Sequence, residues 1–248
     1  MNNFTHPFLD HYLHYNYISS TMEKAEELVE SSNFSGNFLI TADKQGNGIG
    51  RKGNYWYSPS GGLWFTLGIY GFTFKSNFTL FCGLQLLKTL ESLISNPLMK
   101  LAIKWPNDLY MNNKKLAGII VKYLPRSNYY LAGIGLNTNI DKFPAELESI
   151  ATSLKIETSR IFSSTDIITE FLNTLSAELP EYLSEYKLDE KYYMSHDLLR
   201  DHQLKISTEF AEYSGQYLGI SPVGAILLKL PNGAIQPFYA GEITITSR

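Results

Sequence analysis

Two kinds of hydrophobic segment follow each other along this chain. Between residues 79 and 95, and again between about 165 and 186, apolar side chains recur every three to four positions, which predicts helices with one buried face. Ser20 or Thr21, followed by acidic residues from Glu23 onward, predicts a further helix over residues 22–31. Shorter apolar runs between turn residues predict strands at residues 11–19, 37–42, 63–70, 101–105, 116–123 and 129–134.

Beyond about residue 191 the pattern changes. Short strands alternate there with Gly and Pro turns at residues 214–215, 221–222 and 231–233. Such spacing is typical of a small β-barrel or sandwich. The sequence therefore predicts an α+β domain over residues 1–190 and a small C-terminal β domain over residues 191–248.

A block of charged residues falls on what the sequence predicts to be one β-hairpin. Lys104 lies near the end of a strand, and Pro106 stops that strand because proline has no N–H for the ladder. Residues 112–113, both Asn, supply the turn, and the return strand over residues 116–123 follows directly after Lys115. Two lysines held on strands provide fixed positive charge for an anion, which phosphoryl and acyl transfer require.

A glycine-rich segment lies earlier in the chain. Four glycines and two basic residues, Arg51 and Lys52, fall within residues 45–54. Such a loop can surround an anion with backbone N–H groups, but an ordinary surface loop has the same composition. It is neither a dinucleotide fingerprint nor a P-loop, because no helix pattern and no Gly-Lys-Ser/Thr follows it. The residues alone leave both interpretations open.

Composition narrows the class of protein. Hydrophobic residues make up 44% and charged residues 18% of 248 residues, enough for a large core. A net charge of −3 argues against nucleic acid as the main partner. No secretory signal and no apolar stretch of about twenty residues is visible, so we expect a cytoplasmic protein with no membrane partner. The single cysteine, Cys82, falls in an apolar helical pattern and fits a reducing compartment.

The order of these motifs resembles the biotin protein ligases. The succession runs from Ser20-Thr21 through Gln45 and the glycine loop to Trp56, residues 104–108, 115–119 and 133–137, and residues 238–243 also resemble the family's closing strand. The resemblance implies a class II synthetase-like fold, in which helices back a mixed β-sheet and a small SH3-like barrel follows. Only nineteen residues precede Ser20, so we expect no DNA-binding domain there and no DNA partner.

The resemblance also implies a reaction and a set of site residues. Biotin would attack Mg-ATP to give biotinyl-AMP, and a lysine of a biotin carboxyl carrier domain would then take the biotinyl group. The metal ion would arrive with ATP and would not be held by the protein alone. Arg51, Lys115 and Asp108 fall at the catalytic positions. The implied biotin-binding residues are Ser20, Thr21, Met22, Gln45, Gly48, Ile49, Gly50, Arg51, Lys115 and Gly118. The implied ATP-binding residues are Arg51, Trp56, Lys104, Asn107, Asp108 and Asn137.

Three positions depart from the family pattern. Ile49 and Asn54 stand where the loop usually carries arginines, and Met22 stands where Asn or Gln is common. Fewer charges on the loop predict faster loss of biotinyl-AMP. Two alternatives stay open: a lipoate or octanoate enzyme of the same fold, and a biotin-binding protein without catalysis. The sequence does not decide whether two copies form a homodimer.

Overall fold

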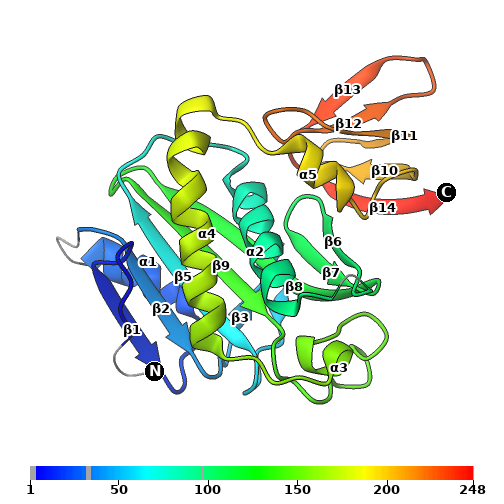
Figure 1. Ribbon diagram of the computed structural model, residues 1–248. Coiled ribbons are helices and arrows are strands. Elements are labelled where there is room, and N and C mark those ends of the chain that lie inside the picture. The colour runs from blue at the N-terminus through cyan, green and yellow to red at the C-terminus, as the bar shows by residue number, and fades with distance from the viewer. Residues whose placement is uncertain (1–3, 32–34, 97, 248) are drawn as a thin grey trace.

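A seven-stranded mixed sheet forms the centre of the structure, a computed structural model that describes residues 4–31, 35–96 and 98–247 (Figure 1). The sheet order is β1-β2-β5-β9-β8-β7-β6. Only β1 and β2 run parallel to each other, and the other neighbours are antiparallel. The strands are β1 (His11–Tyr15), β2 (Phe38–Ala42), β5 (Leu63–Tyr70), β6 (Leu101–Lys104), β7 (Asp108–Met111), β8 (Lys114–Leu124) and β9 (Tyr129–Leu136).

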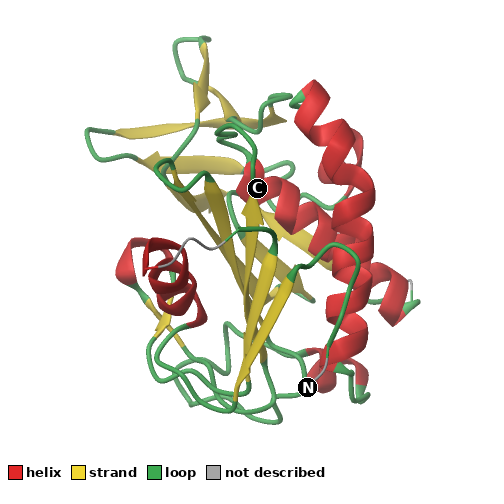
Figure 2. Cartoon of the chain, turned by 90° about the vertical axis from the view of Figure 1, so that its left-hand side faces the viewer, coloured by secondary structure: helices red, strands yellow, loops and turns green. Residues whose placement is uncertain are grey.

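Helices cover both faces of this sheet (Figure 2). On one face α1 packs against β2, β5 and β9, while α2 and α4 pack together on the other face. The helices are α1 (Thr21–Ser31), α2 (Phe78–Ile94), α3 (Leu154–Thr158), α4 (Ser164–Glu185) and α5 (Glu190–Ser195). The α+β fold with a mixed sheet and packed helices confirms the prediction.

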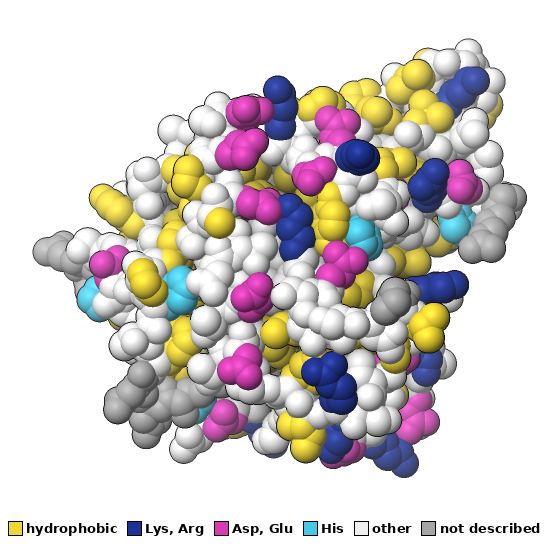
Figure 3. Space-filling view, viewed as in Figure 1, with side chains coloured by type: hydrophobic (Ala, Val, Ile, Leu, Met, Phe, Trp, Pro, Cys, Tyr) yellow, Lys and Arg dark blue, Asp and Glu magenta, His cyan; other side chains and the backbone are white. Residues whose placement is uncertain are grey.

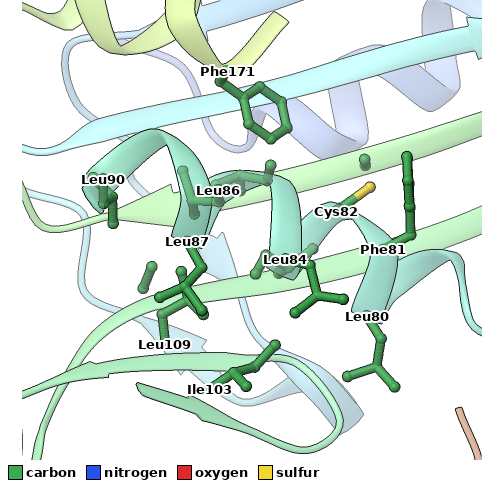
Figure 4. Close-up of a cluster of buried hydrophobic side chains, with 14 of the residues drawn as sticks. Leu80, Phe81, Cys82, Leu84, Leu86, Leu87, Leu90, Ile103, Leu109 and Phe171 are labelled. Atoms are coloured by element: carbon green, nitrogen blue, oxygen red, sulfur yellow. The ribbon is translucent and has the colours of Figure 1, made fainter. Parts of the chain in front are cut away.

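The main hydrophobic core lies between α2, α4 and the sheet (Figure 4). Leu84 and Leu87 of α2 point toward Ile103 and Leu109 of the sheet, and Phe171 of α4 lies on the other side of the helix. All five side chains are at most 1% exposed. The predicted 79–95 helix is buried so completely because it is apolar on most of its circumference.

The charged hairpin contains one strand more than the sequence predicted. β6 ends at Lys104, one residue before the predicted end at Trp105. β7 then returns alongside β6, and the turn at residues 112–113 joins β7 to β8. Both turn residues are left-handed, with φ of 49° and 66°. β7 is only four residues long, with Leu109 and Met111 facing the core, so its alternation is too short to stand out in the sequence.

A second, five-stranded antiparallel sheet follows, in the order β13-β12-β11-β10-β14. It agrees with the predicted SH3-like C-terminal domain, although no pairing of the edge strands β13 and β14 closes a barrel within the described residues. Its strands are β10 (Gln203–Ser207), β11 (Glu212–Ile220), β12 (Ile226–Lys229), β13 (Ile235–Phe238) and β14 (Glu242–Ser247). The boundary between residues 190 and 191 stays a prediction, and it falls at the start of α5.

The two sheets are joined by buried polar contacts. The indole of Trp105 donates to the carbonyl oxygen of Gly224 at 2.9 Å. Asp197, in the connecting segment, accepts hydrogen bonds from the backbone N–H of Leu199 at 2.9 Å and from the hydroxyl of Tyr217 in β11. Burial raises the pKa of Asp197 to about 6, while the hydrogen bonds oppose that rise. These contacts hold the C-terminal sheet against the end of the central sheet.

Acidic and basic side chains are interspersed over the face drawn in Figure 3. Lys88 of α2, for example, forms an ion pair with Glu178 of α4 at 2.7 Å. None of the described helices combines the length and the apolar character that crossing a membrane requires.

Candidate functional site

A cavity of about 270 Å³ lies where the N-terminus of α1, the glycine loop, the middle of β8 and β9 and the C-terminal sheet meet. The loop forms a small hairpin in which β3 (Gly48–Ile49) pairs with β4 (Tyr55–Trp56) around the short 3-10 turn η1 (Arg51–Gly53). Twelve of the predicted site residues line the cavity: Ser20, Thr21, Met22, Gln45, Ile49, Gly50, Arg51, Trp56, Asn107, Asp108, Lys115 and Gly118.

Three predicted residues lie elsewhere. Gly48 is buried beneath the loop, where a Cβ would come within 2.4 Å of the Trp56 carbonyl oxygen, so its role is to let two strands approach closely. Lys104 does not line the cavity, but it stands directly across the β6–β7 pair from Asp108. Asn137 lines a neighbouring cavity instead.

One part of the cavity wall is a buried network of neutral hydrogen bonds. Thr21 donates to Gln45 Oε1 from its backbone N–H at 2.8 Å and from its hydroxyl at 3.1 Å. The amide of Gln45 in turn donates to Ser58 Oγ at 3.0 Å, and Thr66 donates to Thr21 Oγ1 at 2.9 Å. All four side chains are at most 8% exposed. Their fixed orientation suits recognition of a neutral polar group.

The floor of the cavity is made of backbone. Gly118 of β8 and Gly135 of β9 are direct cross-strand partners, and the indole of Trp56 lies over both. A Cβ at Gly118 or Gly135 would come within 2.9 or 2.5 Å of that indole. The indole Nε1 is buried without a hydrogen-bond partner in the described structure. On the same strand Gly133 faces the Met22 side chain.

A charged cluster lies beside this floor. The ammonium of Lys115 is 2.7 Å from Asp108 Oδ2 and lies 5.2 Å from the Trp56 ring centroid. The second carboxylate oxygen, Oδ1, is buried and has no partner in the part of the chain that the structure describes. Burial lowers the pKa of Lys104 below its ordinary value; the charge of Lys115 adds to this effect, and Asp108 opposes it. One carboxylate therefore stands between two lysines and keeps one acceptor atom unused.

Strand register sets the spacing of the two groups. The neutral network contacts β5 at Thr66, the cross-strand partner of Gly133, while Asp108 pairs with Gly118 beside Gly135. Gly133, next to the neutral network, and Gly135, next to Asp108, are two residues apart along β9, which corresponds to about 7 Å. The cavity thus offers neutral hydrogen-bonding groups near Gly133 and charged groups near Gly135.

Arg51 projects from the loop toward the charged cluster. Its guanidinium donates to Asn107 Oδ1 at 3.4 Å and to the carbonyl oxygen of Gly241 at 3.2 Å. Next to it, Lys52 donates to Glu242 Oε1 at 2.7 Å, and this bond lowers the pKa of the Glu242 carboxyl. Gly241 directly precedes β14 and Glu242 is the first residue of that strand, so the C-terminal sheet holds the tip of the loop.

A second cavity, of about 550 Å³, opens on the other side of Trp56 and Lys115, which line both cavities. Aromatic rings from Tyr110 and Phe143 line it, together with Asn137. Asn137 is buried, and its amide donates to the Thr152 carbonyl oxygen at 2.9 Å. Sequence reasoning missed Tyr110 and Phe143 in this cavity, and it missed Gly135 and Glu242 among other residues of the main cavity.

Within residues 4–31, 35–96 and 98–247, no three His, Cys, Asp or Glu side chains gather as metal ligands. His11 and His14, which the sequence places three residues apart on one strand, instead contact neighbouring backbone and Thr41.

Comparison with known proteins gives concordant matches. The family model described as "Biotin/lipoate A/B protein ligase family" matches residues 15–139. The chain is 29% identical to the "Bifunctional ligase/repressor BirA" of Bacillus spizizenii, covering 95% of this chain and 74% of that protein. It is 27% identical to the "Biotin--[acetyl-CoA-carboxylase] ligase" of Paracoccus denitrificans, covering 88% of this chain and 96% of that protein.

Among solved structures, the chain is similar to the biotin protein ligase of Aquifex aeolicus in complex with biotin and ATP. The TM-score is 0.84 at 26% sequence identity, and the match covers 96% of this chain and all of the other. The similarity includes both sheets described above.

Proposed function

Because the chain belongs to the biotin/lipoate A/B protein ligase family, we propose that it joins biotin to a lysine of a biotin carboxyl carrier domain at the expense of ATP. In the first step a carboxylate oxygen of biotin bonds to the α-phosphorus, and diphosphate leaves. In the second step the lysine amine attacks the acyl carbon of biotinyl-AMP, and AMP leaves. The named relatives and the ligand-bound structural neighbour support this proposal.

The observation that carries the proposal is that one cavity is lined both by the neutral hydrogen-bond network and by cations, which belong to the charged cluster and the loop. Gln45 and Thr21 can hold a neutral polar ring, while Arg51 and Lys115 line the same cavity and can hold a carboxylate. Biotin has this division, with a ureido ring at one end and a carboxylate at the other. Between these two ends the Trp56 indole, which lies over Gly118 and Gly135, gives the cavity an apolar surface against which biotin's apolar ring and chain can pack.

The charges also suit the first step. A carboxylate and a triphosphate repel each other, and fixed cations lower the cost of bringing them together. Arg51 and Lys115 are positioned by uncharged acceptors and by Asp108, respectively. We expect both to contact the α-phosphoryl oxygens, where negative charge increases in the transition state.

We assign the base of the nucleotide to the second cavity. Trp56, Tyr110 and Phe143 offer aromatic faces, and Asn137 offers a buried amide at its wall. Lys104 lies outside both cavities, and we propose that its charge acts on the nucleotide through Asp108.

Asp108 suits two further tasks. Mg²⁺ usually combines one or two carboxylates with phosphate oxygens and water, and Oδ1 of Asp108 is an unused buried acceptor beside the cavity. Asp108 would hold an ion that arrives with ATP, and the ion would neutralise phosphate charge. In the second step the same oxygen can accept a hydrogen bond from the incoming amine.

The lone, fully buried Cys82 supports a cytoplasmic location.

The decisive measurement is ATP–pyrophosphate exchange with biotin, lipoate or neither, followed by transfer of labelled biotin to a carrier domain. We expect exchange with biotin only, and label on the carrier lysine. Exchange with lipoate alone would assign the chain to the other branch of the family. Biotin binding without exchange would make it a binding protein.

A further inference from the structure

Three residues line both the main cavity and the second cavity: Tyr55, Trp56 and Lys115. In the proposed function the reacting acyl–phosphate group lies at this junction, because biotin occupies one cavity and the nucleotide base the other. Tyr55 and Trp56 follow each other on β4, and successive side chains of a strand point to opposite faces. The Trp56 indole lies on the glycine floor, whereas Tyr55 is 62% exposed. Tyr55 therefore lies on the solvent side of the junction.

The side chain of Tyr55 has no polar or aromatic partner in the part of the chain that the structure describes. Its hydroxyl makes no hydrogen bond there, and its ring stacks on no other ring. Tyr57, two residues later, packs instead against Phe143, with ring centroids 6.4 Å apart. A single exposed tyrosine needs no explanation in itself. The position of Tyr55 at the junction of both cavities is what gives its exposure a meaning, because aromatic rings are the side chains that most often anchor a protein partner.

The backbone of Tyr55 is held in place by the hairpin. Tyr55 is the cross-strand partner of Ile49 in the β3–β4 pair, and Ile49 also lines the main cavity. The turn between these strands is tied to the C-terminal sheet by the ion pair of Lys52 with Glu242, at 2.7 Å. A ring on an anchored hairpin can contact a partner at a fixed distance from the junction, and it does so at a low cost in backbone entropy.

The second step of the proposed reaction limits how far from the junction the acceptor protein can be. The nitrogen of the neutral amine bonds to the acyl carbon, the bond from that carbon to the phosphate oxygen breaks, AMP leaves with the electron pair, and the nitrogen releases one proton to water. An extended lysine side chain reaches only roughly 6 Å from Cα to Nζ. The backbone of the carrier domain must therefore come close to the junction, where Tyr55 is the most exposed of the three shared residues.

We propose that Tyr55 packs against the carrier domain beside its acceptor lysine and so positions that lysine over the junction, an inference that rests on the proposed function. Tyr55 makes and breaks no bond, so it is a positioning residue for the transfer step and is not needed for adenylation. The two steps can be measured separately, since ATP–pyrophosphate exchange reports adenylation and labelling of the carrier domain reports transfer.

The substitution Tyr55→Ala tests this assignment. We expect the KM for the carrier domain to rise about tenfold, the loss typical of one aromatic contact at an interface, while kcat at saturating carrier changes less than about twofold. The KM values for biotin and ATP in the exchange reaction should stay within about twofold of wild type. Hydroxylamine, a small nucleophile that needs no docking, should take the biotinyl group from both proteins at the same rate. Tyr55→Phe keeps the ring and should behave as wild type, as should Phe210→Ala, which removes a 94% exposed ring that lines neither cavity.

An unchanged KM for the carrier domain in folded Tyr55→Ala would overturn the inference and leave the proposed function intact. A higher KM for ATP with an unchanged KM for the carrier would also overturn it, because Tyr55 would then belong to the nucleotide site. Absence of biotin-dependent exchange in the wild type would instead overturn the proposed function. If thermal unfolding shows that Tyr55→Ala does not fold, Tyr55→Gln removes the ring and keeps a long side chain. The same rise is expected there, and an unchanged constant in that variant would refute the proposal.

Discussion

Lys115→Gln is expected to remove nearly all adenylation while the protein stays folded. Lys115 Nζ lies 2.7 Å from Asp108 Oδ2, in a pair whose side chains are 32% and 18% exposed. Because the pair is partly exposed, and Asp108 still faces Lys104 across the strands, its loss should cost only about 1 kcal/mol of stability. Loss of one fixed donor at a developing oxyanion costs ~2.7–4 kcal/mol of transition-state stabilisation, or about 10²–10³-fold in kcat.

The assay is biotin-dependent ATP–pyrophosphate exchange, with thermal unfolding measured on the same samples. Lys122→Gln is a matched control on the same strand, where the ammonium pairs with Glu26 on the surface, away from the cavity. Lys115→Arg, which keeps the charge, should recover part of the rate. Exchange at a near-normal rate in Lys115→Gln, with Lys122→Gln also normal, would show that the catalytic role belongs to another residue.

Four further outcomes follow from the geometry. Gly135→Ala places a methyl group where the Trp56 indole lies, and overpacking should destabilise this arrangement by ~1–3 kcal/mol. The displaced indole should raise the KM for biotin, and an unchanged KM would place biotin elsewhere. Ile49→Arg restores a loop cation and should slow the release of biotinyl-AMP; an off-rate that does not fall in that variant removes the idea. Lys52→Glu should raise that off-rate severalfold, and adding Glu242→Lys should reverse the effect, whereas a double variant no better than the single one would make the ion pair irrelevant. The carboxyl of Asp197 has a pKa of about 6 in the folded protein and 3.8 ordinarily, so its ionisation destabilises the fold from about pH 4 and does so fully above about pH 6. The stability of Asp197→Asn relative to wild type should therefore increase across that pH window, by at most ~3 kcal/mol. A difference in denaturant unfolding that does not change with pH would contradict this.

Most of the central sheet could be predicted because its strands and helices carry strong local patterns. The helix 79–95 is apolar over most of its length, and the strand 63–70 is bounded by glycines. The placement of Arg51 and Lys115 on one cavity came from resemblance to a family, since nothing local in either segment indicates the other. β7 was missed because its four residues offer only two buried positions, each next to a partly buried one, and so short a pattern does not stand out.

The contribution of the C-terminal sheet to the site could not be derived from local pattern. Lys52 and Glu242 are 190 residues apart in the chain, and each by itself is an ordinary exposed charge. Their contact depends on how two sheets dock, which Trp105 and Gly224 help to set through a single buried hydrogen bond. The cavity of about 200 Å³ between the two sheets likewise forms only through that docking, so no single segment of the sequence predicts it.

The paired glycines of the cavity floor restrict how this protein can change its substrate. Neither Gly118 nor Gly135 has a side chain to shorten, so any substitution there adds atoms and narrows the space. Acceptance of a bulkier acid has to come from trimming the opposite wall, at Met22 or in the loop. Substitutions of these two glycines can therefore only reduce the space for a ligand, so they favour smaller ligands or abolish binding.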